Sequence, residues 1–269
     1  MTILLDELIG TFRRRKAEYR FFDINVWLPI SDKESLYPIA GIDALQAELI
    51  HHEIREAVVT HARSLLYDPP TGNEDVADAI RGKTGLSGGI VWSPEIATAK
   101  REIGLYLDRM IRGGVAIVRL FPKRLNYSLN KWQLGDLFAA MEQRRLPLML
   151  WHTEASWDAI HAICESYPAL PVIVEGNDQK LLYHNRSFIP LLELHANLYV
   201  ETHSLIQHEI IEYIAGERGV DRLLFGSYLP QQDPNGSMMM VAGAAIPENT
   251  KLNIAGGHFR RLLDAIERV

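Results

Sequence analysis

The stretch FFDINVWLP, residues 21–29, decides the fold. Its aromatic and β-branched residues predict a buried strand that ends in a loop at Pro29. Side chains alternate along a strand, so Asp23, Asn25 and Trp27 should point the same way. A strand of this kind can belong to several sheet architectures, and the rest of the chain decides among them.

Seven further apolar runs follow this first one, and their sequences are EAVVTHA, GGIVWS, GVAIVRLF, PLMLWH, PVIVEG, NLYVETH and RLLFGS. The eight runs start 24 to 35 residues apart, which is the length of one strand with one helix. They are continuously apolar rather than alternating, as in parallel strands that are covered on both faces. Eight such units predict an α/β fold, a (β/α)8 TIM barrel.

The segments between the runs have helical patterns. Residues 95–112 should form a helix that stops at the glycines 113 and 114, and residues 130–144 a helix that starts from a cap at Asn130. Ser204 can cap a further helix over LIQHEIIEYIAGERG. We find no linker or internal repeat, so we expect a single TIM-barrel domain over residues 1–269, with residues 1–20 forming a helix that packs on the barrel.

Composition limits the class of protein. The chain has 269 residues, is 47% hydrophobic and carries a formal net charge of −6, which favours a globular protein and no nucleic-acid partner. The first 20 residues are interrupted by Asp6 and Glu7, so they form neither a signal peptide nor a membrane span. We therefore expect a cytoplasmic protein that has no membrane partner. The single cysteine, Cys164, excludes an intramolecular disulfide.

Polar side chains gather where the predicted strands end, and barrel active sites are built there. The set comprises Asp23, Asn25, Trp27, His61, Arg63, Trp92, Arg119, His152, Glu154, Glu175, Asn177, Glu201, His203, Ser227 and Tyr228. Glu201 and His203 lie two residues apart and face the same side, which predicts a general base or metal-binding pair, or else a structural contact. Arg119 could bind a substrate carboxylate through a fork of two hydrogen bonds, or it could anchor a loop.

The strand order and the closing segments RLLFGSYLPQQDP and IPENTKLNIAGGHFRRLL resemble the amidohydrolase superfamily. The similarity is to the amidohydrolase-2 branch, which includes decarboxylases and lactonases. This resemblance implies a divalent metal, usually zinc, held by two histidines on the first strand with help from strands five, six and eight. The matching positions in this chain are Asn25, Trp27, His152, Glu175 and Tyr228.

These replacements argue against the usual metal site. An indole nitrogen only donates hydrogen bonds, and an amide is a weak zinc ligand. His152, Glu175, Glu201 and His203 have acceptable ligand types, but the sequence does not show whether they converge. We predict no cofactor and leave zinc open as the alternative.

The resemblance and the residues together suggest an enzyme. The first hypothesis is an amidohydrolase-like hydrolase of a small carboxylated or sugar-derived substrate, such as a lactone, ester or amide, with a modified and metal-poor site at the C-terminal mouth of the barrel. Catalysis would fall to His152, Glu175, Glu201 and His203, and substrate binding to Asn25, Trp27, Arg119 and Tyr228.

Two alternatives remain open at this point. The same pocket could host a nonhydrolytic decarboxylase, or the barrel could be a catalytically degenerate protein that binds a small ligand. Each hypothesis implies a small-molecule partner. The resemblance also implies that the protein can form a homo-oligomer.

Overall fold

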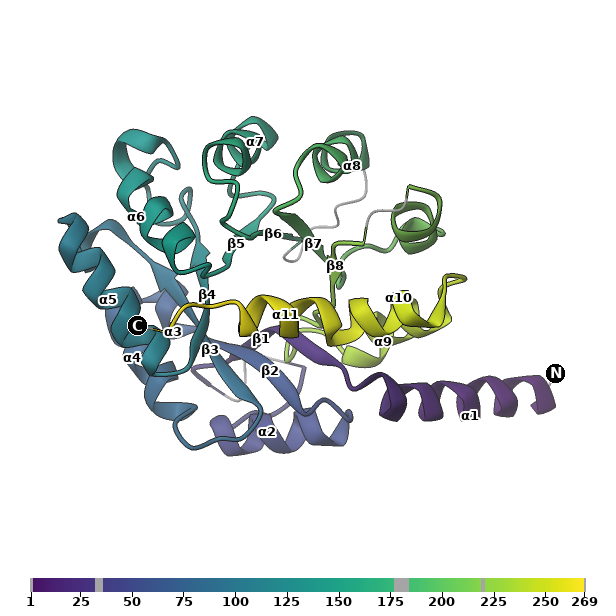
Figure 1. The fold of residues 1–269 in the computed structure, drawn as a ribbon. Helices are drawn as coiled ribbons and strands as arrows, with labels where there is room; N and C mark the ends of the chain where they lie inside the picture. Colours follow the sequence, from purple (N-terminus) through teal and green to yellow (C-terminus); the bar gives the residue numbers. More distant parts are fainter. Residues whose placement is uncertain (1, 32–35, 177–183, 219–220, 269) are drawn as a thin grey trace.

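The computed structural model describes residues 2–31, 36–176, 184–218 and 221–268, and its elements alternate along the chain as a barrel requires (Figure 1). The strands are β1 (Phe22–Leu28), β2 (Glu56–His61), β3 (Leu86–Trp92), β4 (Val115–Leu120), β5 (Leu148–Trp151), β6 (Val172–Glu175), β7 (Leu198–Glu201) and β8 (Leu223–Leu224). The helices are α1 (Thr2–Tyr19), α2 (Ile42–His51), α3 (Arg63–Leu66), α4 (Pro69–Ala79), α5 (Lys100–Arg112), α6 (Lys131–Gln143), α7 (Trp157–Ser166), α8 (Asn185–Leu194), α9 (Pro234–Gly243), α10 (Glu248–Leu252) and α11 (His258–Asp264). Short 3-10 or π-helical segments cover η1 (Pro94–Ile96), η2 (Glu212–Glu217) and η3 (Asn253–Gly257).

The strands form one parallel sheet in the order β1 to β8. The ring is closed by backbone hydrogen bonds between β1 and the segment that contains and follows β8. Ile24 N donates to Phe225 O over 3.1 Å, and Trp27 N donates to Leu229 O over 2.7 Å. The predicted TIM barrel is therefore confirmed, and the side chains of β1 that face inward lie beside those that follow β8.

The barrel is held together by burial of its strands. Apolar side chains from the strands and from the inner faces of the helices form a continuous core, in which residues such as Ile24, Val59 and Leu150 are fully buried. The first helix, α1, extends from the barrel beside α9 (Figure 1). There Arg15 NH1 donates to Ala242 O over 2.6 Å and Lys16 Nζ donates to Asn235 Oδ1 over 2.9 Å.

Two predicted helices have different limits in the structure. The helix expected from residue 95 begins at Lys100, because Glu102 Oε2 accepts hydrogen bonds from the backbone of Thr98 and Ala99 and fixes the start there. The helix expected after Ser204 is shorter, because the chain first turns through a hydrogen bond from Leu205 N to Thr202 O. Helix α6 agrees with its prediction to within one residue at each end.

No helix in the described part of the chain is both long enough and apolar enough to cross a lipid bilayer.

Candidate active site

Five of the predicted site side chains meet inside the C-terminal end of the barrel. The carboxyl ends of parallel barrel strands share one rim, so residues far apart in sequence converge there. The group contains Asn25 from β1, Arg119 from β4, Glu175 from β6, Glu201 from β7 and His203 just beyond β7. All five are buried, and the first four have no solvent-exposed surface. We call this group the buried polar cluster.

Asn25 and Arg119 satisfy the Glu175 carboxylate from two sides. Arg119 NH1 donates to Glu175 Oε1 over 2.9 Å, and Asn25 Nδ2 donates to Glu175 Oε2 over 2.6 Å. The Asn25 Oδ1 atom in turn accepts from Arg119 NH2 over 2.8 Å and from Trp27 Nε1 over 3.2 Å. The polar atoms of Asn25, Arg119 and Glu175 are therefore hydrogen-bonded to one another.

Glu201 orients His203. Glu201 Oε1 accepts from the His203 backbone N over 2.7 Å, and Glu201 Oε2 contacts the imidazole Nδ1. Glu201 therefore fixes both the backbone and the ring of His203 in place. Gly226 makes room for this pair, because a Cβ there would lie 2.2 Å from Glu201 Oε1. The Tyr228 ring stacks on the imidazole at 5.1 Å.

The structure does not bring His152 into the buried polar cluster. Its backbone N donates to Glu175 O over 2.9 Å, and its ring lies 5.0 Å from the ring of His184. Burial lowers the pKa of His152, which favours a neutral imidazole at pH 7. His152 is therefore bound to the backbone of Glu175 and not to its carboxylate.

Asp23 and Ser227 form a second buried contact, across the seam between β1 and the segment after β8. Asp23 Oδ1 accepts from Ser227 N and from Asn25 N, each over 3.0 Å, and Asp23 Oδ2 accepts from Ser227 Oγ. Burial raises the pKa of Asp23 to about 6, although these hydrogen bonds oppose the shift. This contact fixes the backbone on either side of Asn25.

Aromatic side chains cover the buried polar cluster on the side of the mouth. Trp27 lies over the guanidinium of Arg119, with the Arg119 Cζ atom 4.7 Å from the ring centroid. The Trp27 ring centroid is 6.3 Å from those of both Phe121 and Trp151. The cluster is thereby separated from solvent by large apolar groups.

A small pocket of about 140 Å³ opens above this aromatic layer. Its lining residues come from five strand ends and their loops: Trp27, Ala62, Leu65, Leu66, Arg124, Trp151, Tyr228 and Gln231. Arg124 is the cation among them, and its Cζ lies 4.7 Å from the Trp151 ring centroid, with its Nε 3.7 Å from Glu154 Oε1. The pocket can therefore hold a flat ligand against tryptophan and a negative charge against Arg124.

Sequence reasoning missed Arg124 and Phe121. They follow β4 in the run LFPKRLNY, and the cation and the aromatic residue directly after a strand end were the available signal. The predicted residue Asn177 lies outside the described residues. His61 and Arg63 lie on the outer rim, where His61 Nδ1 accepts from Arg63 N and the Arg63 guanidinium pairs with Asp75.

The stability of the fold should depend on the protonation of Glu175. Burial raises its pKa to about 7, although Arg119 opposes the shift, so the folded protein keeps a proton that the unfolded chain loses at lower pH. The stabilisation is present at low pH and is lost as pH rises towards the folded pKa. In urea titrations we expect the free energy of unfolding to fall between about pH 5 and about pH 7.5, and Glu175→Gln to flatten this fall. A free energy of unfolding that rises across this window would contradict the assignment.

The buried polar cluster does not fit a divalent metal. The first-strand positions hold an amide and an indole, and both of their nitrogens are hydrogen-bond donors. Asn25 Nδ2 donates to Glu175 Oε2, and Trp27 Nε1 donates to Asn25 Oδ1. Among the described residues, no group of three or more histidine, cysteine, aspartate or glutamate side chains could hold a metal ion. The resemblance therefore implies a metal that these residues do not accommodate.

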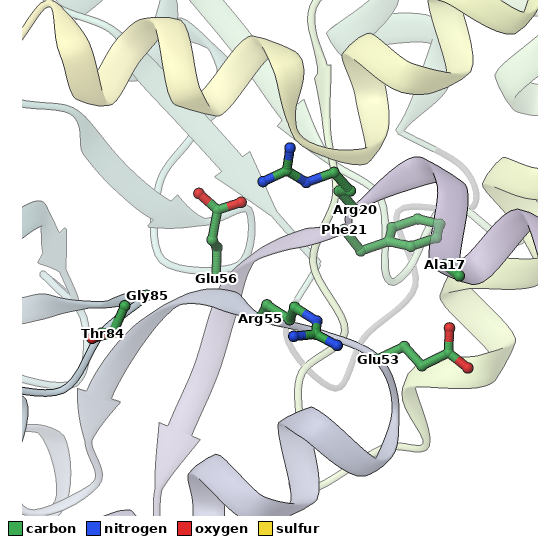
Figure 2. Close-up of a pocket in the computed structure, with 8 residues that line it drawn as sticks. All are labelled: Ala17, Arg20, Phe21, Glu53, Arg55, Glu56, Thr84 and Gly85. Atoms are coloured by element: carbon green, nitrogen blue, oxygen red, sulfur yellow. The ribbon is translucent and has the colours of Figure 1, made fainter.

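A larger hollow of about 720 Å³ lies at the opposite end of the barrel, where the strands begin (Figure 2). Its lining mixes two arginines, Arg20 and Arg55, with two glutamates, Glu53 and Glu56. Glu56 is already paired with Arg260. Catalytic groups of barrel enzymes lie at the other end, so we place the candidate site at the mouth.

Comparison with known proteins gives a fold-level likeness. No family model matches the chain, and no curated protein matches it. Among solved structures, 2,6-dihydroxybenzoate decarboxylase from Rhizobium is 13% identical over 91% of this chain and 98% of its own, with a TM-score of 0.67. A 5-carboxyvanillate decarboxylase from Sphingomonas paucimobilis is 14% identical over 93% and 100%, with a TM-score of 0.65. An amidohydrolase II protein is 12% identical over 91% and 99%, with a TM-score of 0.66.

The expected resemblance to the amidohydrolase superfamily is thus confirmed at the level of the fold. The named neighbours include decarboxylases as well as an amidohydrolase, so the fold favours hydrolysis no more than decarboxylation.

Proposed function

We propose that this protein is a decarboxylase that acts on a small planar carboxylate. The observation that carries the proposal is the arginine-rimmed aromatic pocket above the Glu201–His203 pair, at the end of the barrel where such enzymes react. Trp27 and Trp151 would hold the flat part of the substrate, and Arg124 would bind its carboxylate. The fold shared with two decarboxylases of hydroxylated aromatic acids supports this substrate class.

Decarboxylation suits this site better than hydrolysis. Hydrolysis needs a water molecule beside a base, whereas Glu175 and Glu201 are fully buried beneath aromatic side chains. Decarboxylation consumes no water: the bond between the carboxylate and the ring carbon breaks, CO₂ leaves, and the electron pair left on carbon takes up one proton.

His203 is the residue that would supply this proton. Glu201 fixes the orientation of its imidazole, and an imidazole can carry and release a proton. Tyr228 lies between His203 and the pocket, and its backbone has a φ of 62°, a strained value for a residue with a side chain. We infer that the Tyr228 ring turns aside when the substrate binds.

Replacement of His203 with glutamine tests this role. We expect kcat for CO₂ release to fall by about 100-fold or more with little change in KM, since the proton donor is lost while the pocket remains. The measurement uses hydroxybenzoates labelled with ¹³C at the carboxyl group, in D₂O, with NMR detection of labelled CO₂ and of deuterium at the vacated carbon. His208→Gln is the matched control, because His208 is an exposed histidine outside the site.

Three outcomes would redirect the assignment. Equal loss in His203→Gln and His208→Gln would remove His203 from catalysis. If the protein releases acid from lactones or esters and forms no CO₂, the hydrolase hypothesis would replace the decarboxylase proposal. A ligand that quenches tryptophan fluorescence without any turnover would favour a binding protein. That second candidate has its own support, because the pocket lining contains no acid and no histidine.

A further inference from the structure

Glu154 is a buried carboxylate beside the pocket, and the proposed reaction gives it no role. It lies just after β5 and is 6% exposed. Its Oε2 atom accepts hydrogen bonds from two backbone donors of the loop that follows β4, Lys123 N over 2.8 Å and Arg124 N over 3.1 Å. A buried carboxylate is stable where backbone N–H groups satisfy it in this way. Glu154 therefore fixes the backbone of the loop that carries Arg124.

The loop after β4 is tied to the end of β5 at two further points. Lys123 Nζ donates a hydrogen bond to Thr153 O. The guanidinium of Arg124 lies over the Trp151 ring, with its Cζ 4.7 Å from the ring centroid. A cation over the face of an indole is attracted by the negative charge of the π-system. Arg124 is thus held on the wall of the pocket both by its backbone and by its side chain.

The Arg124 guanidinium has its Nε atom towards Glu154. Arg124 Nε lies 3.7 Å from Glu154 Oε1, which is too long for a hydrogen bond but close enough for attraction between the two charges. No hydrogen bond joins the terminal nitrogens Nη1 and Nη2 to any residue that the structure describes. A planar guanidinium can bind a carboxylate through two parallel hydrogen bonds. The terminal nitrogens are therefore available to the carboxylate of a ligand.

Glu154 also changes the charge balance of the pocket. Arg124 is the charged residue in the lining, and the Glu154 carboxylate lies close to it. A ligand carboxylate that binds Arg124 therefore comes near a second negative charge, and the two repel each other. Because this repulsion grows in proportion to the charge of the ligand, a ligand with two carboxylates is repelled about twice as strongly.

We propose that Glu154 is a positioning residue that determines which charge of ligand the pocket accepts. It holds Arg124 in place for one carboxylate, and its own charge disfavours ligands that carry two. The inference rests on the proposed function in that the pocket holds a planar carboxylate, and it does not require the loss of CO₂.

Replacement of Glu154 with glutamine keeps an oxygen for the two backbone donors and removes the charge. Binding is measured at about pH 8, where carboxylic acids are ionised, by titration of tryptophan fluorescence. The ligands are benzoate, phthalate, which has two carboxylates, and benzamide, which is planar and neutral. We expect Glu154→Gln to bind benzoate about three- to tenfold more tightly than the wild type, and phthalate to gain more than benzoate. Benzamide affinity should change by less than about twofold, whereas a purely structural role would shift all three ligands alike.

Glu142→Gln is the matched control. Glu142 Oε1 also accepts a backbone hydrogen bond, from Ala169 N over 3.0 Å. This contact joins the end of α6 to the segment before β6, at the opposite end of the barrel from the mouth. The control variant should bind all three ligands as the wild type does.

Glu154→Ala removes the backbone acceptor as well as the charge. The amide hydrogens of Lys123 and Arg124 should then exchange with D₂O about tenfold faster, or more, than in Glu154→Gln. Because the loop no longer holds Arg124 over Trp151, benzoate should bind to Glu154→Ala about tenfold more weakly than to Glu154→Gln.

The outcomes separate this inference from the proposed function. A wild type that binds benzoate, with a Glu154→Gln variant that binds it no more tightly, would overturn the inference and leave the proposed function standing. Equal gains for benzoate and benzamide, or an equal gain in Glu142→Gln, would also overturn the inference. A wild type that binds none of the three ligands would contradict the planar carboxylate itself, and the inference would fall with the proposed function.

Discussion

Replacement of Arg119 with methionine should lower the free energy of unfolding by about 3–5 kcal/mol. The change leaves the Glu175 carboxylate without its charged partner in a fully buried site and removes a donor to Asn25 Oδ1. Urea denaturation at pH 7 measures the effect. The loss should be larger at higher pH, because Arg119 lowers the pKa of Glu175 and its removal raises that pKa further.

The double variant Arg119→Met with Glu175→Gln shows how much of the lost stability comes from the unpaired charge of Glu175 and how much from lost packing. Removal of the orphaned acid should recover much of the lost stability, since a buried pair replaced on both sides costs less than one replaced on a single side. Arg144→Met is the comparison, because the Arg144–Asp108 pair keeps some contact with solvent and its loss should cost less. Equal losses for Arg119→Met and Arg144→Met, or no recovery in the double variant, would contradict a charge-balanced cluster.

Replacement of Trp27 with alanine should lower the free energy of unfolding by about 3–5 kcal/mol, because it opens a large cavity over the buried polar cluster. The indole also donates to Asn25 and packs against Phe121 and Trp151, so both contacts disappear together. The pocket loses one wall, and binding of planar carboxylates should become undetectable by titration of the remaining tryptophan fluorescence.

Trp132→Ala controls for the loss of a tryptophan as such. Trp132 is 77% exposed on α6, so its removal should change the free energy of unfolding by less than about 0.5 kcal/mol and leave ligand binding intact. If Trp27→Ala were as mild as Trp132→Ala, Trp27 could not be the cover of the cluster.

The barrel could be predicted from sequence because its signal is repeated eight times. Each apolar run was long enough to identify a strand, and even the two residues of β8 were found through RLLFGS. Helix limits were less accurate, since the start of α5 depends on the side chain of Glu102 and not on apolar spacing.

The strand ends also indicated most of the cluster, because inward-facing residues of parallel strands must converge. The sequence did not predict which side chains of the buried polar cluster hydrogen-bond to each other. Sequence order does not show that the amide nitrogen of Asn25 faces Glu175 and Glu201, or that His152 lies outside. Arg124 was missed because it lies in a loop. The course of a loop, unlike the position of a strand, produces no periodic pattern in the sequence.

The seam that joins β1 to the segment after β8 has a consequence for biosynthesis. Asp23 binds Ser227 and Trp27 binds Leu229 through contacts that span more than 200 residues of chain. A nascent chain that has reached only β7 already carries Glu201 but cannot yet align Asn25 against it. The mouth of the barrel should therefore be among the last parts to assemble, and a chain that ends before β8 should not bind a ligand there.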